Sequence, residues 1–108
     1  VVFKESDYFE KEDVGYNIKW LVPNAQKNHM EPILVTIHPH GQTMIDYPHE
    51  GQEFGYVLEG ELLLFIDNKK IRVKKGETFY FETDKDHFIK NNTDKVAKII
   101  WVSTPPNF

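Results

Sequence analysis

The chain has 108 residues, of which 40% are hydrophobic and 14% aromatic, enough for one packed domain and too few for two independent cores. It contains no cysteine, which excludes disulfide frameworks and thiolate metal sites. The formal net charge is −4, and no basic stripe is present, so we do not expect this chain to bind nucleic acid directly.

Residues 1–14 form a mixed, charged lead-in, which we expect to be a strand or an arm before a single domain over residues 15–108. The lead-in has no signal-peptide pattern, and no apolar run is long enough to cross a bilayer, so we expect a cytoplasmic protein without a membrane partner. The sequence begins at Val1 rather than at methionine, and we expect a further N-terminal region in the natural protein.

From Gly15 onward, short runs rich in Ile, Val, Leu, Phe and Tyr alternate with turn signals, and each run predicts a strand. The predicted strands are Tyr16–Val22, Pro32–His38, Glu53–Glu59, Glu61–Asp67, Lys70–Lys74, Thr78–Phe81, His87–Lys90 and Val96–Ser103. Asp67 and Asn68 predict the tip of a hairpin, since Asp and Asn tolerate the positive φ of tight turns. Many short, evenly spaced strands predict an all-β sandwich or barrel.

Three side chains suited to metal binding lie in two clusters. His49 and Glu53 flank the start of one predicted strand, with Gly51 between them to turn the backbone, and His87 begins a later strand after an acidic turn. Two imidazoles and one carboxylate can cap one face of a divalent metal and leave its other positions open. Such a site requires the two clusters to face each other in the fold.

These clusters resemble the paired motifs of the cupin superfamily. The first motif spaces a histidine, a glutamate and a glycine, and the second spaces a glycine, a histidine and an asparagine. The matching residues are His49, Glu53 and Gly60 in the first motif and Gly76, His87 and Asn91 in the second. The resemblance runs from about Tyr16 to the end of the chain and implies a cupin-type double-stranded β-helix, or jelly-roll, barrel.

Two positions depart from the cupin pattern. Tyr47 stands where the first motif has its first histidine, and Glu82 stands where the second motif has a proline. The resemblance therefore implies three protein ligands, His49, Glu53 and His87, for one divalent transition metal such as Zn, Fe, Ni or Mn. The alternative is a site without metal, whose side chains hydrogen-bond to one another, to water or to a bound molecule.

The same clusters mark the expected pocket for a small-molecule ligand. Its predicted binding residues are Tyr47, His49, Glu53, His87 and Asn91. We expect Tyr47 to be a rim aromatic or a hydrogen-bond donor, because a phenol is protonated at neutral pH. Asn91 has an alternative role as a turn residue that caps a strand. His38 and His40 lie outside the cupin pattern, in a predicted solvated turn.

Strand alternation makes the direction of each side chain testable. If Glu53 points into the barrel, Gly55 and Val57 point the same way. We expect the small residue at position 55 to leave room for a ligand above the carboxylate. The side chains expected to face outward are Phe54, Tyr56 and Leu58.

A narrower resemblance points to a function. Three stretches together are similar to the C-terminal cupin domain of bacterial helix-turn-helix transcriptional regulators: Met30–Ile37, Gly51–Glu61 and Trp101–Phe108. This resemblance implies a homodimeric domain that senses a small, polar effector without turning it over, with the DNA-binding region in the missing N-terminal part. The alternatives are a small metal-dependent enzyme of dioxygenase or isomerase type, and a structural dimerisation module whose barrel is filled by apolar side chains.

Overall fold

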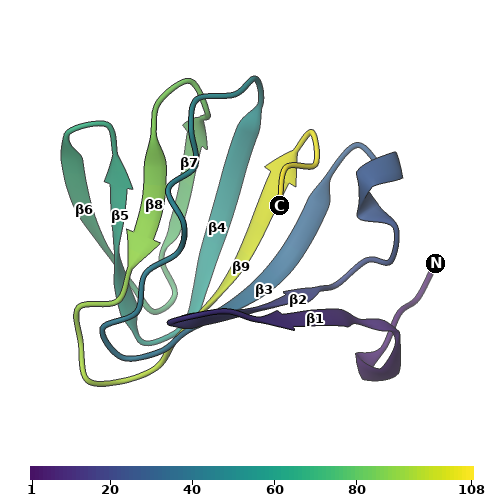
Figure 1. Cartoon of the computed structure of the whole chain (residues 1–108), viewed down its shortest axis with the longest axis horizontal. Coiled ribbons are helices and arrows are strands. Elements are labelled where there is room, and N and C mark those ends of the chain that lie inside the picture. Colours follow the sequence, from purple (N-terminus) through teal and green to yellow (C-terminus); the bar gives the residue numbers. More distant parts are fainter.

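Alternating apolar and polar residues fold into nine strands in the computed structural model, which describes residues 1–108 (Figure 1). The strands are β1 (Phe9–Glu12), β2 (Tyr16–Trp20), β3 (Glu31–Ile37), β4 (Gln52–Glu59), β5 (Glu61–Ile66), β6 (Lys69–Lys74), β7 (Thr78–Glu82), β8 (His87–Lys90) and β9 (Ala97–Thr104). Two single-turn 3-10 helices, η1 (Glu5–Asp7) and η2 (Ala25–Lys27), complete the secondary structure. Each of these helices is a single turn, and neither could span a membrane. The all-β prediction is confirmed, and within the lead-in only β1 forms a strand.

The strands form two antiparallel sheets. The larger sheet has the order β1-β2-β3-β9-β4-β7, and the smaller has the order β6-β5-β8. The last strand, β9, lies between β3 and β4 and pairs with both, with Ile99 opposite Val35 and Trp101 opposite Gly55. Figure 1 shows the smaller sheet on the left and the larger sheet fanning out to the right, the arrangement of a jelly-roll barrel.

The hydrophobic core fills the space between the two sheets. Every second residue of β3 is buried, from Glu31 to Ile37, and β9 shows the same alternation. Each large aliphatic side chain that is fully buried contributes about 1.5–3 kcal/mol relative to an exposed position. The buried cluster consists of Tyr16, Ile33, Val35, Ile37, Val57, Leu62, Leu64, Val73, Ile89, Ile99 and Trp101.

The predicted orientation of β4 is confirmed. Glu53, Gly55 and Val57 are buried on the inner face of the strand. The alternate side chains lie on the outer face and stay about two-fifths exposed: Phe54 at 41%, Tyr56 at 40% and Leu58 at 41%. The inward direction of Glu53 places a carboxylate inside the barrel.

Two turns between consecutive strands follow from local backbone chemistry. The β5–β6 hairpin turns at Asp67 and Asn68 as predicted, and Asp67 has a φ of 53°. Gly60 joins β4 to β5 with a φ of 72°, and a Cβ atom there would lie 2.6 Å from the carbonyl oxygen of Val96. Only glycine fits this turn without strain.

The expectation that Gly55 leaves room for a ligand is wrong. A Cβ atom at position 55 would lie 2.3 Å from Cζ of Phe79, which stands opposite Gly55 on β7. The ring of Phe79 therefore occupies the space beside the glycine. Its centroid lies 6.1 Å from that of Trp101, in an edge-to-face arrangement typical of packed aromatic side chains.

The Gly55→Ala substitution is expected to lower the free energy of unfolding by about 1–3 kcal/mol, because the added methyl group overpacks the contact with Phe79. Urea denaturation followed by circular dichroism measures the loss. The Gly55→Ala/Phe79→Leu double variant removes the ring and should be less destabilised than the sum of the two single variants. Strict additivity would contradict this account of the contact.

Candidate functional site

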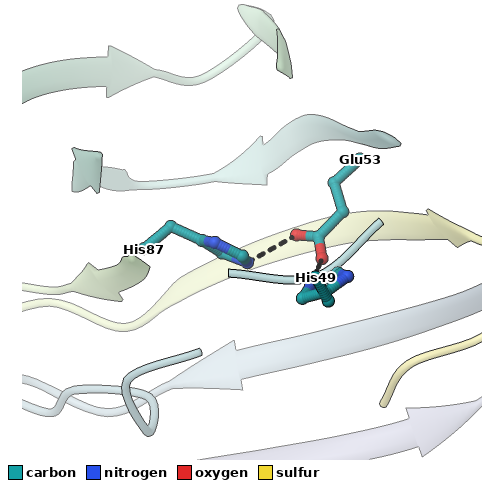
Figure 2. A group of neighbouring side chains, drawn as sticks. All are labelled: His49, Glu53 and His87. Atoms are coloured by element: carbon teal, nitrogen blue, oxygen red, sulfur yellow. Dashed lines mark ion pairs between the residues drawn. The ribbon is translucent and has the colours of Figure 1, made fainter. Parts of the chain in front are cut away.

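His49, Glu53 and His87 converge inside the barrel (Figure 2). His49 lies in the loop before β4, Glu53 is the second residue of β4, and His87 is the first residue of β8. Nε2 of His49 is 3.5 Å from Oε2 of Glu53, and Nε2 of His87 is 3.3 Å from Oε1 of the same carboxylate. One ligand atom from each residue lies within 4.8 Å of the others. The two sequence clusters thus face each other, as a shared site requires.

Hydrogen bonds hold the two loops of the site together. The backbone N–H of His49 donates to the carbonyl of Thr83 at 2.8 Å, and the hydroxyl of Thr83 donates to the carbonyl of His49 at 2.8 Å. The backbones of Asp46 and His87 exchange two further bonds, of 2.8 and 3.0 Å. Both imidazoles are therefore positioned by backbone contacts that do not depend on a bound ion.

The carboxylate of Glu53 is fully buried. Its Oε1 accepts a hydrogen bond of 2.8 Å from Nε1 of Trp101 on β9. A buried charge without partners costs several kcal/mol, so this contact is part of what allows the carboxylate to lie in the core. Sequence reasoning did not assign Trp101 to the site. The signal was present in the alternation of Ile99, Trp101 and Ser103, which places the indole on the inner face of β9.

Asp46 supplies a second carboxylate beside His87, with Oδ2 3.3 Å from Nε2. Burial lowers the pKa of His87, but the carboxylates of Asp46 and Glu53 outweigh this effect and, with the carbonyl of Lys85, raise the pKa to about 10. Nδ1 donates to that carbonyl at 3.0 Å, which turns Nε2 toward the carboxylates. Sequence reasoning missed Asp46, since it lies in a loop without strand alternation.

Two buried atoms of the site, Oε2 of Glu53 and Nε2 of His87, make no hydrogen bond of good geometry, although Nε2 of His87 lies 3.3 Å from two carboxylate oxygens. Buried polar atoms are rarely left in this state. A carboxylate oxygen and an imidazole nitrogen are both donor types that bind divalent transition metals. With Nε2 of His49 they form a two-histidine, one-carboxylate set, so the residues present fit such an ion.

The remaining predicted ligand-binding residues do not join this set. Tyr47 is 74% exposed in the loop before β4, and its ligand role stays a prediction. Asn91 is fully buried, and its amide nitrogen donates to the carbonyls of Ile37 at 3.1 Å and Lys95 at 2.6 Å. Its Oδ1 accepts bonds from the backbone and hydroxyl of Thr93. These contacts correspond to the alternative role of Asn91, that of a turn residue.

His38 and His40 lie outside the cluster, as the cupin pattern predicts. Nε2 of His38 is 2.8 Å from a carboxylate oxygen of Glu12, and Nε2 of His40 is 2.7 Å from one of Asp94. All four side chains are well exposed. These histidines form surface pairs rather than additional ligands.

A cavity of about 190 Å³ lies beside three residues that contact the triad. Eight of its 12 lining residues are hydrophobic, so its walls are mainly apolar. Three lining residues, Asp46, Trp101 and Asn107, each contact one member of the triad. These three residues connect the cavity to the triad, although no member of the triad lines the cavity itself.

Comparison with known proteins gives relatives along the whole chain. The sequence model of the family described as Cupin domain matches residues 33–103. An uncharacterized protein of Methanocaldococcus jannaschii is 36% identical over 87 residues, which are 80% of this chain and 70% of that protein. The HTH-type transcriptional regulator PuuR of Escherichia coli is 31% identical over 109 residues, which cover 100% of this chain and 58% of the regulator.

Solved structures with the same fold include both regulators and enzymes. An HTH_3 family transcriptional regulator from Vibrio cholerae matches with a TM-score of 0.76 and 27% identity, over 88% of this chain and 53% of that chain. A sugar phosphate isomerase of the cupin superfamily from Silicibacter pomeroyi matches with a TM-score of 0.75 and 25% identity, over 86% and 61% of the two chains. The chain spans little more than half the length of the regulators it matches. Because the family match covers most of its residues, the chain belongs to the cupin family.

Proposed function

We propose that this cupin domain is the effector-binding and dimerisation domain of a helix-turn-helix transcriptional regulator. The alignment with PuuR carries the proposal, because it covers 100% of this chain and only 58% of the regulator. The part of such a protein outside the alignment would hold the DNA-binding region. Contact with DNA then belongs to the parent protein, which would act in the cytoplasm.

The effector would bind in the cavity beside the triad. Apolar walls and a volume of about 190 Å³ favour a metabolite smaller than a drug-sized ligand, with an apolar body and a polar group. The polar group would reach Asp46, which lines the cavity and contacts His87 of the triad. A change in DNA binding requires the effector to prefer one of two arrangements of the regulator.

We propose that His49, Glu53 and His87 hold one divalent transition metal, namely Zn, Fe, Ni or Mn. A bound ion with open positions would supply a Lewis acid that attracts an oxygen or nitrogen atom of the effector. Residues outside the ligand set orient the ligands through hydrogen bonds: Trp101 donates to Glu53, and the carbonyl of Lys85 accepts from the ring of His87. These two hydrogen bonds support a site whose side chains are already oriented for an ion.

The triad also supports a second candidate, a small metal-dependent enzyme of dioxygenase or isomerase type. The specific observation in its favour is the two-histidine, one-carboxylate set, which is used by iron oxygenases. Ligand binding and catalytic turnover would use the same three residues, so an experiment is needed to distinguish the sensor from the enzyme. The alignment with PuuR favours the sensor as the first candidate.

We propose the outer face of the larger sheet as the surface of a homodimer. Phe54 and Tyr56 of β4 lie beside Val102 and Ile100 of β9, and Tyr80 of β7, which is 60% exposed, lies opposite Phe54. A contiguous exposed apolar face of this kind marks an interaction site. A second copy is the partner that the proposed function requires, because helix-turn-helix regulators read paired half-sites as dimers.

The purified domain is expected to bind one divalent ion, and the His49→Ala/His87→Ala double variant is expected to lose it because two of three ligands are removed. Native mass spectrometry after loading with Mn²⁺, Fe²⁺, Ni²⁺ or Zn²⁺ measures the bound mass. The matched control is His38→Ala/His40→Ala, which removes the same number of imidazoles from surface pairs. Equal loading of both double variants would refute the proposed ligands.

A sensor is expected to bind its ligand without consuming it. Small metabolites that raise the melting temperature of the Fe²⁺-loaded domain should be recovered unchanged, with no oxygen uptake above that of the His49→Ala/His87→Ala variant. Thermal shift, an oxygen electrode and mass spectrometry of the recovered metabolite provide the three readouts. Catalytic turnover of any of these metabolites would favour the enzyme over the sensor.

The Tyr56→Lys substitution is expected to convert a dimer into a monomer, because it places a charge in the centre of the apolar face. Size-exclusion chromatography with light scattering gives the mass. Ile71→Lys is the matched control, since Ile71 is 43% exposed on β6 of the other sheet and should leave the dimer intact. A wild-type domain that is monomeric at high concentration would overturn the proposed interface.

A further inference from the structure

The last residues of the chain fold back after β9 and are held by a buried carboxylate far away in the sequence (Figure 1). Oε1 of Glu31 accepts hydrogen bonds from the backbone N–H groups of Asn107 at 2.9 Å and Phe108 at 2.6 Å. Its Oε2 accepts a bond of 2.9 Å from Nε1 of Trp20. Glu31 is fully buried, so one of its oxygens holds the C-terminal segment while the other is held by Trp20 of β2.

The hydrogen bonds from the backbone of Asn107 and Phe108 to Glu31, called here the Glu31 latch, place the side chain of Asn107 against the triad. Its Nδ2 lies 3.0 Å from Nε2 of His49, the nitrogen that faces Oε2 of Glu53. Nδ1 of His49 is 3.3 Å from the carbonyl of Glu50, which can only accept a hydrogen bond, so Nδ1 carries the proton and Nε2 holds the free lone pair. Asn107 therefore donates to the lone pair that a metal would use.

The same segment also forms part of the cavity wall. Asn107 and Phe108 line it, and the ring of Phe108 lies 5.2 Å from that of Trp101, the hydrogen-bond donor to Glu53. The latch, the cavity wall and the contact with His49 thus belong to one short stretch of chain. A molecule or ion that binds at His49 has to displace the Asn107 amide.

We infer that Asn107 is an internal competitor for the ligand position of His49, held in place by the Glu31 latch. This inference rests on the proposed metal site. The latch keeps the amide beside the imidazole, so its effective concentration is high. Because the coupling is reciprocal, an ion bound at the triad should in turn release the Asn107 side chain. The C-terminal segment would then report whether the site is occupied.

The test compares Zn²⁺ affinity in the full chain by isothermal titration calorimetry. Asn107→Ala removes the competing amide but keeps the backbone N–H groups that Glu31 binds, so the latch stays closed. We expect Zn²⁺ to bind about threefold to tenfold more tightly, the change that corresponds to the loss of one competing hydrogen bond. The matched control is Asn28→Ala, an exposed asparagine outside the site, which should leave the affinity unchanged.

A second variant tests the latch itself. In Glu31→Gln the amide group cannot accept hydrogen bonds at both of its ends, so the segment is held less firmly and Zn²⁺ affinity should again rise. Nuclear magnetic resonance gives a readout independent of affinity: on addition of Zn²⁺ to the wild-type chain, the side-chain amide signals of Asn107 should shift. If Glu31→Gln fails to fold, Asn107→Ala and the amide signals still decide the question.

The outcomes separate the two proposals. Tighter binding by Asn107→Ala together with shifted amide signals supports the competitor. If the wild type binds Zn²⁺ and Asn107→Ala binds with equal or lower affinity, the competitor is refuted while the metal site stands. If neither protein binds Zn²⁺, the metal site is refuted, and the competition with it is refuted as well.

Discussion

The burial of one carboxylate is the constraint on which the rest of the structure depends. Glu53 points into the barrel from β4, where a charge is tolerated only if other groups compensate for it. The compensation comes from the indole of Trp101 on one side and from the imidazole of His87 on the other. Trp101 comes from β9 of the larger sheet and His87 from β8 of the smaller one, so both sheets must be in place before the carboxylate is satisfied. The site is thus built into the packing of the barrel.

The strands and the triad were predictable from the sequence for physical reasons. Period-2 alternation predicted which residues share the face of Glu53, and turn chemistry at Asp67 predicted a hairpin, because both signals are local. The space at Gly55 was predicted wrongly, since the ring that fills it comes from another strand. Asp46 and Asn107 were missed for a related reason: they reach the site from irregular segments, whose backbone path depends on contacts distant in the sequence.

Strand β4 offers a short physical connection between ligand binding at the triad and the association of two subunits. Strand β4 carries Glu53 on its inner face, while Phe54 and Tyr56 on its outer face belong to the proposed dimer surface. A shift of this strand on ligand binding would reach the partner subunit without any further connecting element. The backbone bonds between Asp46 and His87 also tie the loop before β4 to β8 of the smaller sheet. Sensing and dimerisation are therefore compatible within so small a domain.

The position of β9 has a consequence for the order in which the protein acquires its structure. This strand is the last in the sequence, yet it lies between β3 and β4 and supplies Trp101 to the site. During synthesis the larger sheet stays divided until β9 has left the ribosome, since β3 and β4 have no direct pairing with each other. Pairings between strands so far apart in sequence form slowly. The inward carboxylate thus acquires its indole partner only when the sheet closes, so a nascent chain that stops short of β9 has an incomplete site and two exposed strand edges.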